Sequence, residues 1–229
     1  MDDLFTPRGF SGRTLVRSDL APLAGGAPQV LVDCDLEDAD LSGLDLTGWR
    51  FERCNLRKAD CSGTKLEGSV WQSCRAPFVS FVGANLSEAA FSGGDFNNSV
   101  WRRATLTSAK FVGTKLTGAD FTEARAMHVQ FEEVLLVSAK LPGFSFRKET
   151  LRRVDFSGAD LRKGDFRMSV FEDCSLREAM VSGSRFEGSD LRGADLGGLR
   201  LVDAGLFRGA TISREQAGQL LGELGLNVR

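Results

Sequence analysis

Tyrosine is absent from this chain of 229 residues, although phenylalanine occurs 17 times. A protein that uses Phe freely and Tyr never is expected to have aromatic core positions with no room for a phenolic hydroxyl. Proline is scarce, at 5 residues, which excludes collagen-like sequences and proline-rich linkers. The apolar fraction of 42% is that of a folded domain rather than of a disordered chain.

Residues suited to catalysis or metal binding, such as histidine and cysteine, are also few. The single histidine, His128, has no partner in the sequence pattern and is expected on the surface. The cysteines are odd in number and form no C-x-x-C pair, which disfavours zinc ribbons and secreted disulfide frameworks; they stand at 34, 54, 61, 74 and 174. We expect them to be buried as small apolar side chains. With no phosphate-binding loop or dinucleotide motif, the sequence predicts no enzyme, no cofactor and no metal site.

Charge of one sign is not in excess. The 29 basic and 31 acidic residues give a net charge of −2, which predicts neither a nucleic-acid binder nor a strongly acidic mimic of one. The first residues, MDDLFTPR, lack the basic and then apolar layout of a signal peptide. No run approaches the roughly 18 apolar residues of a membrane span. A cytoplasmic protein is therefore expected, with no membrane partner.

A period of five residues dominates the chain. Steps of five from Leu36 to Leu206 give 35 positions, of which 17 are Leu and 12 are Phe, and none is charged. The residue two places before each of these is nearly always small. The unit is therefore small–x–large–x–x, as in Ala39-Asp40-Leu41-Ser42-Gly43.

This period excludes both common elements, because a helix needs 3.6 residues per turn and a strand needs two. Five residues suit a short extended piece followed by a turn, with two side chains inward and three outward. Four units would close a square coil of 20 residues, and stacked coils would pair their backbones at about 4.8 Å. We predict an all-β solenoid in which neighbouring coils together bury the core.

The pattern resembles the pentapeptide-repeat family, whose consensus is A-[DN]-L-x-x, over residues 30–208. The resemblance implies a right-handed quadrilateral β-helix. It gives three parts: a degenerate first coil and loop at 1–29, the β-helix at 30–208, and a C-terminal helix and dimerisation tail at 209–229. In the first part Phe5, Phe10, Leu15 and Leu20 step by five in another phase, and 21–29 is expected to be an exposed loop.

The unbroken register predicts no inserted loop between Leu36 and Leu206. Two places are expected to be distorted. One is Ala76, which is followed by Pro77-Phe78, and the other runs from Pro142 to Glu149.

The C-terminal segment carries a helix signal. Ser213 and Gln216 form a capping box, and Gly225 fits a helix C-terminus. The helix would cover the open end of the stack, which is an exposed sheet edge. Capping alone and capping with dimerisation both remain open. The candidate dimerisation residues are Leu220, Leu221, Leu224, Leu226 and Val228.

The same tail, EQAGQLLGELGLNV, resembles the segment QA-x-x-LL-x-x-LGI of the Qnr fluoroquinolone-resistance proteins. This resemblance, shared with MfpA and the albicidin-protection protein, implies a dimer joined through its C-terminal ends. It also implies binding to DNA gyrase or topoisomerase IV, and protection of that enzyme from poisons, without direct contact to nucleic acid. The alternative function is an interaction scaffold unrelated to topoisomerases.

Mimicry of DNA by the whole stack would need one acidic face, because duplex DNA carries one negative charge about every 1.7 Å. The outward residues instead divide nearly evenly between acids and bases on each of the four faces. The face that contains Leu36 holds 7 acids and 5 bases, that of Leu41 holds 6 acids and 6 bases, that of Leu46 holds 5 acids and 7 bases, and that of Phe51 holds 6 acids and 6 bases. Only the first coil is locally acidic. Its residues are the candidate partner-binding set: Asp35, Glu37, Asp38, Asp40 and Asp45.

Overall fold

The computed structural model describes residues 9–199 and 204–228 and forms a parallel β-solenoid of about nine turns. Two compact units divide the chain: residues up to 115 with Glu123–Gln130, and Leu116–Thr122 with the residues from 131 on. Phe5 and Leu201, which the period assigned to inward positions, lie outside the described residues.

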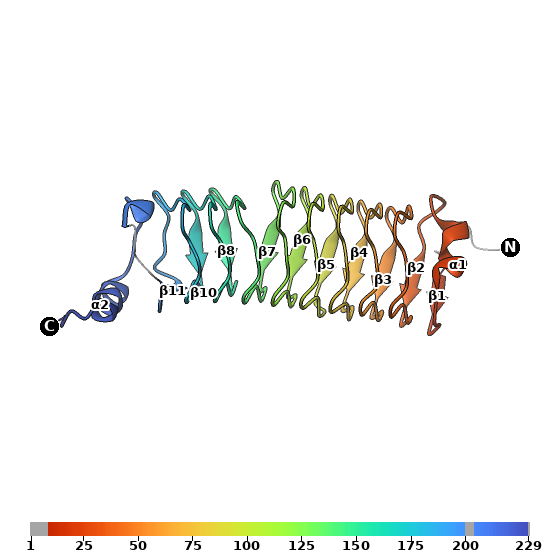
Figure 1. Cartoon of the computed structure of the whole chain (residues 1–229), viewed down its shortest axis with the longest axis horizontal. Helices are drawn as coiled ribbons and strands as arrows, with labels where there is room; N and C mark the ends of the chain where they lie inside the picture. Colours follow the sequence, from red (N-terminus) through yellow and green to blue (C-terminus); the bar gives the residue numbers. More distant parts are fainter. Residues whose placement is uncertain (1–8, 200–203, 229) are drawn as a thin grey trace. The chain divides into compact units, whose positions relative to one another are not determined.

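One face of each coil in the first unit is a short parallel strand, and the strands lie side by side in chain order (Figure 1). From β2 on, each residue pairs with the one a full coil later, so that Phe51 lies beside Trp71 and Trp71 beside Phe91. The strands are β1 (Gly9–Ser11), β2 (Val30–Val32), β3 (Arg50–Glu52), β4 (Val70–Gln72), β5 (Ala90–Ser92) and β6 (Lys110–Val112).

The second unit repeats this plan and then ends in a helix (Figure 1). It contains the last two residues of β7 (Gln130–Glu132), β8 (Thr150–Arg152) and β9 (Val170–Glu172), and the pair β10 (Cys174–Ser175) and β11 (Ala194–Asp195). The 3-10 helix η2 (Ala204–Phe207) and the helix α2 (Arg214–Glu223) follow. None of the helices that the structure describes is long and apolar enough to cross a membrane.

The predicted inward positions are confirmed. From Leu36 to Leu196 every fifth residue is buried except Ala126, which is half-buried. Aromatic rings stack from coil to coil, with ring centroids 4.1 Å apart for Phe51 and Trp71 and 4.7 Å apart for Phe166 and Phe186. Such close stacking on all sides leaves no space for the hydroxyl that Tyr would add, in agreement with its absence.

Most corners, other than those that directly follow a strand of the long sheet, are β-turns that begin at the large inward residue of the unit, which we call the central residue. At Leu56 the amide of Ala59 donates to the Leu56 carbonyl at 3.0 Å, and the third residue of the turn, Lys58, has φ +56°. A positive φ at this position is the mark of a type II turn, which favours Gly or Asn there and accepts Pro one residue earlier.

That turn corrects the expectation of distortion at the two proline sites. Pro77 and Pro142 occupy the second turn position, where proline is favoured. Hydrogen bonds between coils continue through both sites: Ala76 donates to Asp95 at 2.7 Å, and Gly143 donates to Arg162 at 2.8 Å. The hydrogen bonding between coils also continues at Glu149, because its carbonyl accepts a bond from the amide of Val170 at 3.0 Å.

The period does change at the C-terminal end, where the prediction of an unbroken register was wrong. Phe186 donates to the carbonyl of Leu206, one residue later than the coil pattern requires, and its ring stacks on Phe207 at 4.7 Å. Asp190 pairs with Thr211, again one residue beyond the position that the other coils would use. Phe207 therefore takes the stacking position that the period assigned to Leu206.

The N-terminal segment packs against the first full coil. Phe10 pairs with Leu31, and Leu15 and Leu20 are buried. The helices α1 (Arg17–Leu20) and η1 (Ala21–Leu23) lie between β1 and β2 in the chain. The segment 21–29 is mostly exposed, but Gly25 donates to the Asp45 carbonyl at 2.8 Å and Gln29 is buried.

Candidate partner-binding surfaces

The five acidic candidates of the first full coil lie on its outside, and the next coil supplies a basic partner for two of them. Glu37 pairs with Arg57 at 3.4 Å, and Asp45 pairs with Lys65 at 3.0 Å. These partners stand one coil later in the chain, so the stacking of coils places them directly alongside.

Asp35 and Asp40 are also engaged. Asp35 accepts from the side-chain amide of Asn55 at 2.8 Å, and Asp40 pairs with Arg17 of α1 at 3.2 Å. The Ser42 hydroxyl and amide donate to Asp40 and hold the pKa of that carboxyl below its ordinary value. Among the described residues, Asp38 alone of this set has a carboxylate with neither an ion pair nor a hydrogen bond, so the cluster is not an open acidic patch.

Ion pairs also neutralise the coils of the second unit. Three carboxylates accept a two-pronged pair of bonds from the Arg two residues later: Asp160 from Arg162, Asp165 from Arg167, and Asp190 from Arg192. In each case the arginine is the main cause that lowers the pKa of the carboxyl. The balanced charge counts of the four faces therefore correspond to local pairing rather than to separate patches.

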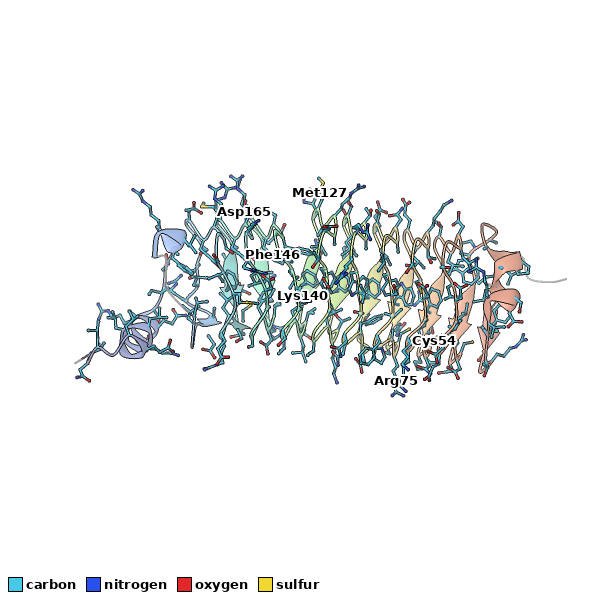
Figure 2. All side chains as sticks on the ribbon, viewed as in Figure 1. Cys54, Arg75, Met127, Lys140, Phe146 and Asp165 are labelled. Atoms are coloured by element: carbon cyan, nitrogen blue, oxygen red, sulfur yellow. The ribbon has the colours of Figure 1, made fainter. Side chains whose placement is uncertain are left out.

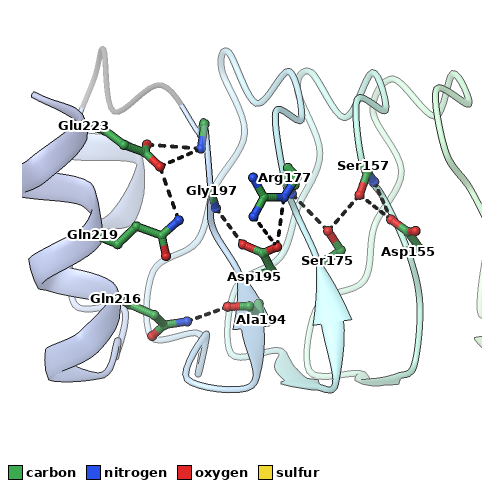
Figure 3. A network of polar contacts seen from close by, with 11 residues as sticks. Asp155, Ser157, Ser175, Arg177, Ala194, Asp195, Gly197, Gln216, Gln219 and Glu223 are labelled. Carbon is green, nitrogen blue, oxygen red and sulfur yellow. Dashed lines mark hydrogen bonds and ion pairs between the residues drawn. The ribbon is translucent and has the colours of Figure 1, made fainter.

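The C-terminal helix α2 closes the last coil through polar contacts. The buried side-chain amide of Gln216 donates to the carbonyls of Leu191 and Ala194, at 2.7 and 2.6 Å. Glu223 accepts from the amide of Gly198 at 3.0 Å (Figure 3). These bonds satisfy backbone groups that an open coil end would leave without partners.

Both predicted ends of α2 are confirmed. Ser213 and Gln216 form the reciprocal capping box. At the other end Gly225 has φ +83°, its amide donates to Gly222, and the amide of Leu226 donates to Leu221 at 3.0 Å. This pair of bonds is the Schellman motif, which favours glycine at the left-handed position.

The five candidate dimerisation residues separate into two groups. Leu220 is buried against the coil end, with 6% of its surface exposed. The other four are exposed apolar side chains, which we call the tail patch: Leu221, Leu224, Leu226 and Val228. The cap and the candidate dimer contact therefore use different side chains of the same segment.

The sulfur and imidazole groups are placed as the sequence predicted. All five cysteines are free and buried, and burial raises the pKa of the Cys61 and Cys174 thiols. His128 is exposed. Over residues 9–199 and 204–228, no group of three His, Cys, Asp or Glu side chains is placed to hold a metal ion.

One surface residue was missed by the sequence analysis. Phe78 is 53% exposed and is the one exposed aromatic side chain among the described residues. The doublet Pro77-Phe78 was interpreted as a weak corner, and the outward side of that corner was not considered. An aromatic residue outside the five-residue register was the signal available.

Comparison with known proteins agrees with the coil architecture. A family model for the pentapeptide repeat region matches residues 44–121, and a model for pentapeptide repeats (8 copies) matches residues 130–167 and 169–204. No curated protein sequence matches the chain.

Two solved structures illustrate the similarity. A trypsin-treated variant of QnrB1, a plasmid-mediated fluoroquinolone resistance protein, is 19% identical over 97% of this chain and 98% of that chain, with a TM-score of 0.55. HetL, a pentapeptide repeat protein involved in heterocyst differentiation regulation from the cyanobacterium Nostoc sp., is 18% identical over 88% of this chain and 84% of that chain, with a TM-score of 0.38. At so low a sequence identity, the likeness to QnrB1 shows the fold alone.

Proposed function

Because the chain belongs to the pentapeptide-repeat family, we propose that it binds a type II DNA topoisomerase and protects it from antibiotic poisons. The partner would be DNA gyrase or topoisomerase IV. The role is one of binding rather than catalysis, and it would be exercised in the cytoplasm. QnrB1, which shares the fold, is a fluoroquinolone resistance protein.

The observation that carries this proposal is the construction of the C-terminal cap. Three residues of the QA-x-x-LL-x-x-LG segment have a structural part in the cap: Gln216 bonds to carbonyls of the coil end, Leu220 is buried, and Gly225 ends the helix. Sequence similarity in so short a segment would mean little alone. Its agreement with a working cap supports a shared C-terminal design with the resistance proteins.

We propose a second copy of this chain as the occupant of the tail patch. The cap uses Leu220 and leaves the tail patch, which begins at Leu221, outside. Four exposed apolar side chains in so short a segment are costly to leave in water, at about 25 cal/mol per Å². A C-terminal dimer would bury them, and it would present two solenoids to a topoisomerase that is itself symmetric.

The alternative function, a scaffold that binds a protein other than a topoisomerase, is favoured by one observation. Many acidic residues of the coils are paired with Arg or Lys, as in Asp160 with Arg162, so the surface does not repeat the charge of DNA. Binding to a topoisomerase would then use specific side chains rather than overall mimicry.

A supercoiling assay separates the two functions. Purified protein is added to DNA gyrase reactions with and without a fluoroquinolone. We expect supercoiling to be restored in the presence of the drug. A matched sample of an unrelated solenoid at the same concentration controls for crowding. If micromolar protein neither rescues nor inhibits gyrase or topoisomerase IV, the protection proposal is wrong and the scaffold remains.

A further inference from the structure

Phe78 occupies a position that the fold would fill better with another residue. It is the third residue of the turn from Ala76 to Val79, with φ +62°. Other coils place glycine or, most often, a polar residue at this position, as in Gly43, Lys58 and Asn98. A bulky side chain in the left-handed region is strained, and an exposed phenyl ring gains nothing from burial.

The backbone around Phe78 is nevertheless fixed. The Phe78 amide donates to the Asn97 carbonyl at 2.9 Å, and the Pro77 carbonyl accepts from Lys58 at 3.0 Å. Pro77 restricts its own φ as well. The Phe78 ring therefore projects from a rigid corner. Burying it against a partner would cost little conformational entropy, because the backbone that carries it is already ordered.

Two basic residues lie on the same face as this ring. Lys58 holds the equivalent turn position in the preceding coil, and Arg75 is the second residue of the pentapeptide from Cys74 to Phe78. Figure 2 shows Arg75 extending away from the coil interior. Within the described part of the chain neither Lys58 nor Arg75 makes an ion pair. We name this surface the Phe78 patch: Lys58, Arg75, Pro77, Phe78 and Asn98.

The charges nearby indicate the kind of partner. Asp35 and Asp38 lie on the same face, two coils before Phe78. Asp95 lies on the next coil, paired in the ladder with Arg75. A nucleic acid backbone crossing this face would meet carboxylates on both sides of the cations, which disfavours it. A protein surface with an apolar pocket bordered by a few carboxylates complements the patch.

We infer that the Phe78 patch is the surface through which the first unit docks on the topoisomerase, with the Phe78 ring inserted in a pocket bordered by carboxylates. This inference rests on the proposed function. It assigns the main contact to a basic and aromatic corner, whereas mimicry of DNA would assign it to acidic residues.

The test compares two substitutions at equivalent turn positions. Phe78→Asn removes the ring and places a residue that the left-handed turn favours, so the melting temperature should be unchanged or higher. Met168→Asn is the matched control, because Met168 is also exposed and has φ +60°. Binding of each to immobilised DNA gyrase is measured by surface plasmon resonance. We expect Phe78→Asn to raise the Kd about 30-fold, as at an interface hot spot, and Met168→Asn to leave it unchanged.

A double charge reversal, Lys58→Glu with Arg75→Glu, tests whether these two cations face carboxylates at the edge of the partner's pocket. It should slow association and reduce its dependence on salt. If the wild type binds gyrase and Phe78→Asn binds equally well, the inference is wrong while the proposed function stands. If the wild type neither binds nor protects the enzyme, both are wrong. Loss of binding to a duplex DNA oligonucleotide on Phe78→Asn would also overturn the inference, since it would make the patch a nucleic-acid site.

Discussion

At the scale of single residues, the corner turns leave one backbone amide outside the ladder between coils. This is the amide of the residue that follows the large inward residue. It donates to the side chain of the residue two places earlier when that residue is Asp or Asn, as the amides of Ser42 and Thr122 do. The four other amides of the unit bond to neighbouring coils or close the turn. Proline is therefore tolerated at one of five positions.

Two threonines in one corner test this rule. Thr105 donates its amide to the Ala84 carbonyl at 2.9 Å, whereas Thr107 is the second residue of the turn from Leu106 to Ala109. We expect Thr105→Pro to reduce the free energy of unfolding by about 3 kcal/mol. Thr107→Pro should change it by less than about 1 kcal/mol, as a proline suited to its turn does. Urea denaturation followed by circular dichroism measures both, and equal losses would contradict the rule.

The pairing of Asp160 with Arg162 predicts a dependence of stability on pH. Arg162 holds the folded pKa of Asp160 below that of the unfolded chain, about 3.9. The pair therefore stabilises the fold at pH values above the unfolded pKa, and this contribution is lost as the pH falls through the folded pKa. Asp160→Asn should cost about 1 kcal/mol at pH 7. The difference in stability between wild type and Asp160→Asn should vanish at the lowest pH at which the protein is still folded.

Melting temperatures of wild type and Asp160→Asn, taken between pH 7 and pH 3, check this expectation. Asp38→Asn is the control, since Asp38 is exposed and lacks an ion pair among the described residues. A gap between wild type and Asp160→Asn that stays constant with pH would show that the lost stability does not come from the carboxylate charge.

At the scale of elements, the helix α2 is held by a small number of contacts, of which Gln216 makes the most. Gln216→Glu keeps the bond from the Ser213 amide but replaces two donors with a carboxylate facing the Leu191 and Ala194 carbonyls. We expect this change to destabilise docking of α2 by about 3 kcal/mol. Hydrogen exchange of the α2 amides should accelerate accordingly.

Gln219→Glu is the matched control, because Gln219 is exposed and, within the described part of the chain, its side chain hydrogen-bonds to Glu223 alone, at 3.3 Å. Its effect should be below about 0.5 kcal/mol. Similar exchange in the two variants would mean that α2 is not held by Gln216.

The sequence predicted the elements wherever a short-range pattern determined them. The five-residue period predicted the buried column from Leu36 to Leu196, and the capping box predicted the start of α2. The one-residue shift at the C-terminal end could not be predicted, because Leu206 fits the five-residue period in the sequence. In the structure it is Phe207 that stacks on Phe186. The proline sites were misjudged because the turn type was not inferred from the period.

The candidate site was predicted less well than the fold. The acidic set of the first coil was identified correctly as outward, but its ion pairs join residues a full coil or more apart, such as Asp45 with Lys65 and Arg17 with Asp40. The partners of a side chain in a stack depend on the coils above and below. Phe78 was missed because the search for partner residues followed charge alone.

At the scale of the whole molecule, the proposed dimer can be tested without disturbing the cap. Leu224→Glu with Val228→Glu places charges in the tail patch but leaves Gln216 and Leu220 in contact with the coil. We expect a dimeric wild type and a monomeric double variant by multi-angle light scattering, with the dissociation constant raised at least about 30-fold.

Met168→Glu, which alters an exposed apolar residue of another surface, should remain dimeric. A wild type that is monomeric at micromolar concentration would remove the dimer from the proposal. It would leave the assignment of α2 as a cap intact.

The distribution of the tryptophans has a practical consequence. Trp49, Trp71 and Trp101 are fully buried and all belong to the first unit, and the chain has no tyrosine. Intrinsic fluorescence excited in the near ultraviolet therefore observes the first unit alone. The second unit is spectroscopically silent, and of the five buried cysteines Cys174 alone belongs to it. A colorimetric thiol reagent would therefore count one thiol when the second unit opens by itself and five when both units open, while the tryptophan signal follows the first unit.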